Sequence, residues 1–234
     1  MSRGMSFDRL APHYRWMEAV LAGRVLQQAR TRWLDALRER RRVLIVGEGP
    51  GRTLEVMRRR WSRQRVTVVE ASAGMIAAAQ RRLARQGLSS EGIEWVHADV
   101  RSWLGERERT VEGGAEFDAV ITPFVLDCFG AAELAGVVAG IAGQVSDGGC
   151  WLLTDFCLPP SGLRRLRGRL VHRLMYSFFR AAVKLEASRL TPPDEALVAA
   201  GFELEGRDLF NAGLVHSDLW RRMESARGLM RIKA

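Results

Sequence analysis

The sequence predicts a single-domain α/β fold, residues 1–234, and three observations lead to it. Short apolar runs rich in β-branched residues alternate with segments of helical periodicity, a pattern typical of βα units. A glycine-rich turn directly follows the first of these runs. The chain has 234 residues and a mass of 26.2 kDa, which fits one domain with a sizeable core.

The composition is that of an ordinary globular protein, with 47% hydrophobic residues. No apolar run reaches the roughly 18 residues that a membrane-spanning helix requires. The N-terminal stretch MSRGMSFDRL lacks the hydrophobic core of a signal peptide. Cys128, Cys150 and Cys157 have neither metal-site nor disulfide-framework spacing. We therefore expect a cytoplasmic protein with reduced thiols and without a metal site.

Positive charge is concentrated in one segment. The formal net charge is +9, and residues 157–190 hold eight Arg or Lys against Glu186 alone. A localised basic face favours an anionic partner, which could be a membrane surface, an acidic substrate or nucleic acid.

Residues 1–42 are predicted to form a helical N-terminal cap before the first strand, with helical spacing clearest over 24–39. His13 and Tyr14 lie in an aromatic stretch of this cap. They could close over a ligand or pack the helix onto the sheet, and the sequence leaves both interpretations open.

The first predicted strand, 43–46 (VLIV), ends in the turn 47–51 (GEGPG), and a helical pattern over 52–62 follows. The glycines permit positive φ and a close approach of the backbone to a ligand. The helix start offers N–H groups and the positive end of the helix dipole. This order predicts a site for a nucleotide-like ligand.

A second predicted strand, 65–69, ends at Glu70, which lies 19 residues after Gly51. In a βαβ unit this step brings an acid to the edge of the sheet beside the glycine turn. A carboxylate there can accept hydrogen bonds from both ribose hydroxyls of an adenosine ligand. The alternative is a solvated glutamate at a strand end.

A third strand, 92–98, follows the predicted helix 71–85, for which Ser72 is a plausible N-cap. It leads to Asp99, which could bond the exocyclic amine of adenine or cap a helix over 100–104. The polar residues 105–116 are predicted to form a surface loop.

The fourth predicted strand, 117–122, opens into the apolar turn 123–129, which contains Asp127. This aspartate could face a substrate or cap the following helix. That helix is predicted over 131–145, a turn over 146–149 and a fifth strand over 150–156.

Residues 157–193 are predicted to form an inserted, basic amphipathic helix, with apolar residues at helical spacing over 163–182. It could be a lid over the substrate, an interfacial anchor or a core-facing helix. A helix over 194–200 and two strands, 202–206 and 213–220, are expected to complete the fold, and the two strands could form a hairpin.

The chain resembles class I S-adenosylmethionine-dependent methyltransferases in five motifs. These are VLIVGEGPG (43–51), VVEASAGMI (68–76), HADV (97–100), FDAVITPFVLDCF (117–129) and GGCWLLTDF (148–156). The resemblance implies a Rossmann-like, seven-stranded, mostly parallel sheet with an antiparallel last strand and helices on both faces. It also implies S-adenosylmethionine as cofactor. The FDRLAPHY start is similar to the ubiquinone/menaquinone methyltransferase-like subgroup.

The resemblance also implies a role for individual residues. The methionine end of the cofactor would be lined by Gly47, Glu48, Gly49 and Gly51, and the ribose would be held by Glu70. The adenine would be flanked by Ala71 and Met75 and contacted at its amine edge by Asp99 and Val100. Pro123 and Phe124 would lie near the sulfonium. Family members commonly carry an acid at the end of the first strand, where this chain has Val46. Glu48 inside the turn could compensate.

The expected function is methyl transfer to a small, lipophilic molecule reached beneath the 163–182 helix, which could also contact an anionic membrane. Transfer from a sulfonium is an in-line displacement, so alignment supplies much of the rate. A base is needed only if the nucleophile is protonated, and the candidates are Asp127, Tyr14, His13 and His172. The alternatives are a nucleic-acid (RNA) methyltransferase and a non-catalytic S-adenosylmethionine-binding protein. A nucleic-acid substrate is disfavoured because strand four ends in TPFV rather than in an NPPY-like motif.

Overall fold

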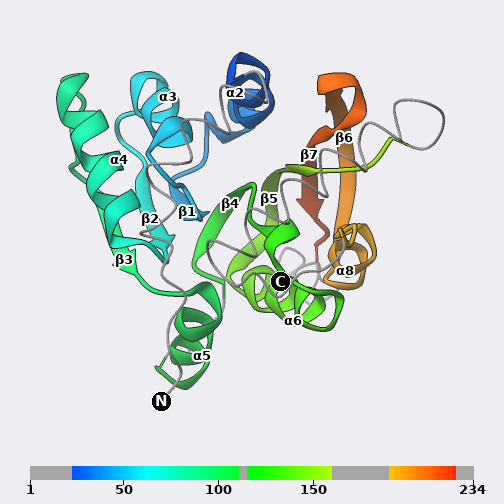
Figure 1. Ribbon diagram of the computed structural model, residues 1–234. Coiled ribbons are helices and arrows are strands. Elements are labelled where there is room, and N and C mark those ends of the chain that lie inside the picture. Colours follow the sequence, from blue (N-terminus) through cyan, green and yellow to red (C-terminus); the bar gives the residue numbers. More distant parts are fainter. Residues whose placement is uncertain (1–22, 111–114, 160–189, 225–234) are drawn as a thin grey trace.

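The computed structural model describes residues 23–110, 115–159 and 190–224 (Figure 1). The predicted positions of His13, Tyr14, His172 and the basic 163–182 helix lie outside these residues.

A seven-stranded sheet forms the centre of the molecule, with strand order β3-β2-β1-β4-β5-β7-β6. The strands are β1 (Arg42–Val46), β2 (Arg65–Glu70), β3 (Ile93–His97), β4 (Phe117–Pro123), β5 (Val145–Phe156), β6 (Phe202–Phe210) and β7 (Val215–Arg222). Strands β1 to β5 pair in parallel, and β7 is antiparallel to both of its neighbours. The predicted seven-stranded sheet with an antiparallel last strand is therefore confirmed.

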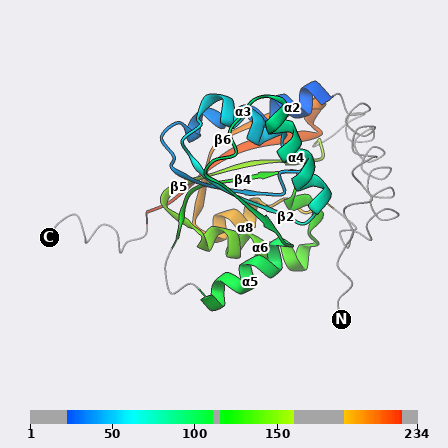
Figure 2. The same ribbon diagram turned by 90° about the vertical axis from the view of Figure 1, so that its left-hand side faces the viewer.

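Helices cover both faces of this sheet (Figures 1 and 2). One face carries α2 (Gly23–Thr31), α3 (Arg52–Arg60) and α4 (Ala73–Arg85). The short η2 (Leu34–Leu37) packs into the core on the same face. The other carries α5 (Val100–Thr110), α6 (Ala131–Gly143) and α8 (Asp194–Ala199). Two further 3-10 turns are η3 (Leu126–Cys128) and η4 (Asn211–Gly213). Among the helices of the described ranges, none has the length and apolar character needed to cross a bilayer.

The period-2 geometry of β1 explains why its residues form a central strand. Leu44 and Val46 contribute to the core under α5 and α6, whereas Val43 and Ile45 contribute to the core under α3 and α4. All four are buried. A continuous β-branched run fits a strand covered on both faces, because alternate side chains enter opposite cores.

In the middle of the chain, two predicted element boundaries were wrong. Residues 105–110 continue helix α5 instead of forming a loop. Arg107 explains the extension, because its guanidinium lies 5.1 Å from the Trp103 ring and donates to Gln144 Oε1 at 2.7 Å. Strand β5 begins at Val145, not at 150, since Val145 pairs with Phe117 before a shift of register.

The C-terminal strands form the expected hairpin but are longer than predicted. β6 and β7 pair from Phe202↔Arg222 to Phe210↔Val215 and are joined through η4. The N-terminal 24–39 segment is divided into α2 and η2 rather than one helix.

Candidate functional site

The three glycines of the turn after β1 have different structural roles. Gly47, Gly49 and Gly51 all have positive φ, at 70°, 65° and 84°. A Cβ added to Gly47 would lie 2.2 Å from Val125 Cγ2, and one added to Gly51 would lie 2.8 Å from the Cα of Ala79 in α4. Apart from its two chain neighbours, no described residue has an atom within 4 Å of a Cβ built on Gly49. Gly47 and Gly51 thus pack the turn against its neighbours, and Gly49 leaves space for a ligand.

Glu48 caps helix α3 from inside this turn. Its Oε1 accepts hydrogen bonds from the backbone N–H of Thr53 at 2.8 Å and of Leu54 at 2.9 Å. Its Oε2 is buried and accepts no hydrogen bond from any described residue. Burial raises the pKa of Glu48 from its usual 4.5 to about 7, although the two backbone bonds and the charge of Arg30 oppose the rise.

Glu70 joins the glycine turn to the start of α4. Its Oε2 accepts from Gly49 N at 3.0 Å and its Oε1 accepts from Ser72 N at 3.0 Å. Burial raises its pKa, against the effect of these backbone donors. A carboxylate offers about four lone-pair positions, so acceptor capacity remains for ribose hydroxyls. The 19-residue step from Gly51 therefore does bring this acid beside the turn.

The residues expected around adenine lie at the same edge of the sheet. Ser72 is the N-cap of α4, as predicted, and its hydroxyl accepts from Met75 N at 3.2 Å. Ala71 precedes it, and Met75 is buried. His97, the last residue of β3, pairs in register with Glu70 and lies 3.2 Å through Nε2 from the Ala71 carbonyl oxygen.

Asp99 accepts a hydrogen bond from the first turn of helix α5, which is the helix-cap alternative that the sequence left open. Its Oδ1 accepts from Arg101 N at 2.8 Å, and its Oδ2 lies 2.9 Å from the Arg101 guanidinium. Burial alone would raise the pKa of Asp99, but the hydrogen bonds and charge of Arg101 hold it below its usual value. The neighbouring Val100 is buried. Contact of either residue with adenine stays a prediction.

The turn after β4 approaches the glycine turn through Val125. Pro123 ends β4, and Phe124 follows with φ of 61°, an uncommon conformation for a bulky residue. Its backbone N–H donates to the carbonyl of Thr154 at 2.7 Å. The Arg30 guanidinium lies 4.7 Å from the centre of the Phe124 ring. The fold thus brings together the positions expected near the methionine end and near the sulfonium.

Asp127 is buried in this second turn, in contact with another carboxyl. Its backbone N–H donates to Asp155 Oδ2 at 3.0 Å, and the two side chains are hydrogen-bonded to each other. Burial raises the pKa of both groups, that of Asp155 well above its usual range. Asp127 does not cap α6, whose N-cap is Gly130. Two carboxyls in contact disfavour double ionisation, and the charge of Asp127 is therefore a second cause of the raised pKa of Asp155.

Sequence reasoning missed Asp155 and the polar network on β7 beside it. Asp155 pairs in register with His216, whose Nδ1 lies 2.8 Å from Asp218 Oδ2. Asp218 is fully buried, and Arg207 donates to both of its oxygens at 2.8 and 2.7 Å. The signal was present in the polar residues of otherwise apolar strands, TDF in β5 and HSD in β7.

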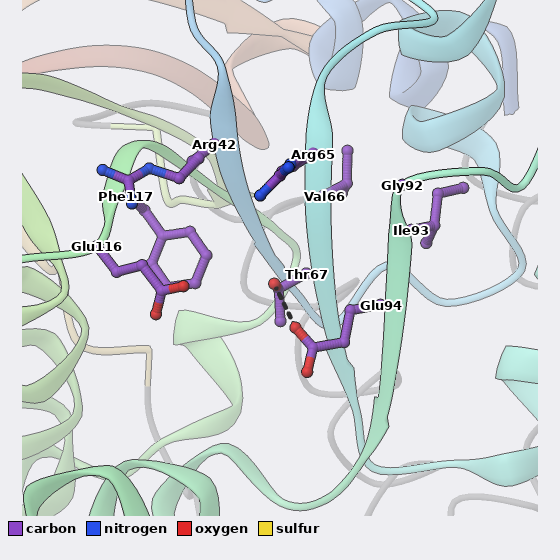
Figure 3. Close-up of a pocket in the computed structure, with 9 residues that line it drawn as sticks. All are labelled: Arg42, Arg65, Val66, Thr67, Gly92, Ile93, Glu94, Glu116 and Phe117. Atoms are coloured by element: carbon purple, nitrogen blue, oxygen red, sulfur yellow. Dashed lines mark hydrogen bonds between the residues drawn. The ribbon is translucent and has the colours of Figure 1, made fainter. Parts of the chain in front are cut away.

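A separate pocket of about 370 Å³ lies at the opposite edge of the sheet (Figure 3). Arg42, Arg65 and Phe117, which begin β1, β2 and β4, contribute to its lining. Ligands of open α/β sheets bind at the carboxyl ends of the strands, so this pocket is distinct from the glycine-turn site. No group of three or more possible metal ligands occurs in the described ranges.

Comparison with known proteins agrees with this geometry. Residues 43–149 match the family model described as a methyltransferase domain. Trans-aconitate 2-methyltransferase of Rhodopseudomonas palustris (strain BisA53) is 35% identical over 72 residues, which are 31% of this chain and 24% of that protein. The match therefore spans about a quarter of this curated relative.

Solved structures show the same fold at low identity. The apo form of the S-adenosylmethionine-dependent methyltransferase SibL has a TM-score of 0.63 at 20% identity, covering 96% of this chain and 64% of that one. Magnesium protoporphyrin IX methyltransferase of Synechocystis PCC 6803, with bound SAH, has a TM-score of 0.59 at 16% identity, covering 84% and 83%. Residues 43–149 match the methyltransferase-domain model, and this match agrees with the predicted family. The chain has the fold of class I S-adenosylmethionine-dependent methyltransferases.

Proposed function

We propose that the protein transfers a methyl group from S-adenosylmethionine to a small molecule. The observation that carries this proposal is the glycine turn, where Gly49 borders open space and donates its N–H to Glu70, while Glu48 caps helix α3 from within the turn. These features fit a ligand with a cationic amino acid end and a ribose. The protein's activity is inferred from this site together with the family of residues 43–149.

Each predicted cofactor residue has a physical role in this proposal. The turn residues Gly47, Glu48, Gly49 and Gly51 would hold the methionine end, Glu70 the ribose, Ala71, Met75, Asp99 and Val100 the adenine, and Pro123 with Phe124 the methyl end. The cofactor supplies a methyl group made electrophilic by the positive sulfur. The chain would then align the acceptor with that methyl group and exclude water.

Asp127 is the proposed base for an acceptor that is still protonated. The Asp127–Asp155 pair would carry one proton and one negative charge. It would take the acceptor's proton and become neutral while the acceptor receives the methyl group. The pair would then release the proton to solvent. The raised pKa of both carboxyls supports this role, because a higher pKa makes a carboxylate a stronger base.

The proposed acceptor is small and lipophilic. Support comes from an apolar cluster beside the second turn, in which Phe124, Phe156 and Phe210 are only partly buried. The rings of Phe124 and Phe156 lie 5.0 Å apart. The predicted 163–182 helix would close over this acceptor, and its contact with an anionic membrane is part of the same proposal.

The test is cofactor binding followed by labelled methyl transfer. We expect S-adenosylhomocysteine to bind with micromolar affinity and Glu70→Ala to weaken binding by about 1–2 kcal/mol through lost charge-assisted hydrogen bonds. Glu203→Ala, at an exposed position of β6, is the matched control and should bind normally. Calorimetry showing no binding by the native protein would overturn the cofactor assignment.

Methyl transfer is then measured with S-adenosylmethionine carrying a labelled methyl group and a fractionated cell extract. A labelled small molecule, identified by mass spectrometry, supports the proposal. Label only in RNA or DNA would favour a nucleic-acid methyltransferase, with binding that weakens steeply as salt rises. Binding without any transfer would favour a non-catalytic S-adenosylmethionine-binding protein.

A further inference from the structure

Two arginines lie side by side at the edge of the sheet opposite to the glycine turn. Arg42, the first residue of β1, pairs in register with Arg65, the first residue of β2. Neighbouring strands are about 4.8 Å apart, so the two side chains start close together. Arg42 shares its face of the sheet with Leu44, and Arg65 shares it with Val69, both in the core under α5 and α6. Two like charges are therefore neighbours on one face, which is unfavourable unless an anion lies near them.

Two acids of this edge accept hydrogen bonds from groups other than these guanidiniums. Asp118 uses both carboxylate oxygens to accept from the backbone N–H groups of Arg41 and Arg42, at 2.7 and 3.0 Å. Glu94 Oε2 accepts from the Thr67 hydroxyl at 2.9 Å (Figure 3). Both carboxylates are thus held by neutral donors.

The third acid, Glu116, is neutralised by the guanidinium of Arg107 in helix α5. Within the part of the chain that the structure describes, the guanidinium groups of Arg42 and Arg65 form no ion pair. Both residues are exposed, so a ligand can reach them. Each guanidinium stays charged and offers five N–H donors in a planar fork, which matches the oxygens of a phosphate or a carboxylate.

The same two arginines line one pocket. Its volume is about 370 Å³, which falls in the range of small-molecule sites, about 300–1,000 Å³. In Figure 3, Arg65 extends from β2 toward the strand that carries Arg42, and Phe117 lies beyond Arg42. The pocket thus combines two cations that lack a described counter-charge with room for more than a single inorganic anion.

We propose that this pocket is a second ligand site, which binds the phosphate group of a small phosphate monoester between Arg42 and Arg65. A phosphate monoester carries about −1.5 to −2 charges at pH 7 and has three acceptor oxygens, so one ligand neutralises both guanidinium groups. A carboxylate carries a single charge and neutralises only one of them. The remaining volume of the pocket accommodates the organic part of the ester.

The second site is independent of the proposed function. Arg42 and Arg65 begin their strands, whereas the glycine turn follows the last residue of β1. The two sites therefore lie at opposite ends of the same strand, and a ligand at one leaves the other open.

The experiment is calorimetric titration of the full chain at pH 7.5 with two probes, phenyl phosphate and benzoate. The ionic strength is about 0.15 M, at which charges more than about 8 Å apart are largely screened. We expect one phenyl phosphate per chain, bound at least about fivefold more tightly than benzoate. Arg42→Gln and Arg65→Gln should each weaken phenyl phosphate binding about tenfold, because each removes charge-assisted hydrogen bonds.

The matched control is Arg81→Gln. Arg81 is an exposed arginine of α4, on the other face of the sheet, and it does not line the pocket. Its replacement removes the same charge and should change the affinity for phenyl phosphate less than about twofold. Thermal denaturation of the three variants shows that each is folded, since all three positions are exposed.

Three results would overturn the inference. They are no binding of phenyl phosphate by the native protein, benzoate binding as tight as that of phenyl phosphate, and equal weakening by all three variants, which would indicate a general attraction to a chain of net charge +9. Saturating S-adenosylhomocysteine should leave phenyl phosphate binding unchanged, and competition between them would place the phosphate at the glycine turn and refute the second site. Arginine-dependent binding of phenyl phosphate supports the second site even if S-adenosylhomocysteine does not bind, so the two proposals fail separately.

Discussion

Replacing Gly51 by alanine should destabilise the protein much more than the same replacement at Gly49. Both residues have positive φ, so both variants bear the cost of a left-handed alanine, about 1–2 kcal/mol. Only at Gly51 would the new Cβ lie 2.8 Å from the Cα and 2.9 Å from the Cβ of Ala79. Overpacking against the backbone of α4 adds about 1–3 kcal/mol. The expected losses in free energy of unfolding are therefore about 2–5 kcal/mol for Gly51→Ala and about 1–2 kcal/mol for Gly49→Ala.

Urea denaturation of the two variants and the native protein measures this difference, since it compares alanines with similar backbone strain and different neighbours. Calorimetry should show that Gly49→Ala weakens ligand binding more than Gly51→Ala does. Gly49→Ala puts a methyl group into the space assigned to the cofactor and should weaken S-adenosylhomocysteine binding more than tenfold, about 1.4 kcal/mol. Equal stability of the two variants would refute the packing argument. Unchanged binding by Gly49→Ala would refute the role of the open space.

Two further predictions concern buried acids. Because the pKa of Glu48 rises from 4.5 to about 7, the stability gained with its protonated form is complete below about pH 4.5 and is lost as the pH rises through 7. Glu48→Gln should therefore raise the free energy of unfolding by about 3 kcal/mol at pH 8.5 and change it little at pH 4.5. Urea denaturation that shows equal effects at both pH values would contradict this prediction. Asp218→Asn should lower the free energy of unfolding by about 3 kcal/mol, because it leaves Arg207 and His216 without the fully buried carboxylate. The control Asp208→Asn removes an exposed ion pair with Arg32 and should lower the free energy of unfolding by less than about 1 kcal/mol. The pKa of Asp218 is lowered by Arg207 and His216 despite its burial, so this contribution is complete above about pH 4 and should decrease as the pH falls below that value. Thermal denaturation of both variants at pH 7 and pH 3.5 checks the prediction. Equal losses of stability in the two variants at pH 7 would show that burial of the Asp218–Arg207 pair does not matter.

Those parts of the fold that depend on local patterns could be predicted from the sequence. The run 43–46 was identified because four consecutive apolar residues suit a strand buried on both faces. Glu70 was placed beside the glycine turn because the length of a βα unit determines the position of the next strand end. The cap at Ser72 followed from its chemistry alone.

The errors and omissions come from contacts between distant residues. The polar residues 105–110 are helical because Arg107 packs on Trp103 and bonds Gln144, 37 residues away. Asp99 could not be assigned because a helix cap and an adenine contact call for the same residue type at the same place. The Asp127–Asp155 contact joins residues 28 positions apart, and nothing in the order of the sequence reveals it.

The bonds of Glu70 to Gly49 and Ser72 have a consequence for the entropy of ligand binding. Both carboxylate oxygens are already tied to backbone N–H groups, one in the glycine turn and one at the start of α4. The side chain therefore has little rotamer freedom left to lose when a ribose arrives, and each immobilised side chain otherwise costs about 0.5–1.5 kcal/mol. The same bonds restrict the turn itself. The ribose end of the site is thus preorganised in the free protein, so less of the binding free energy is lost to ordering the site and more remains to align the methyl group.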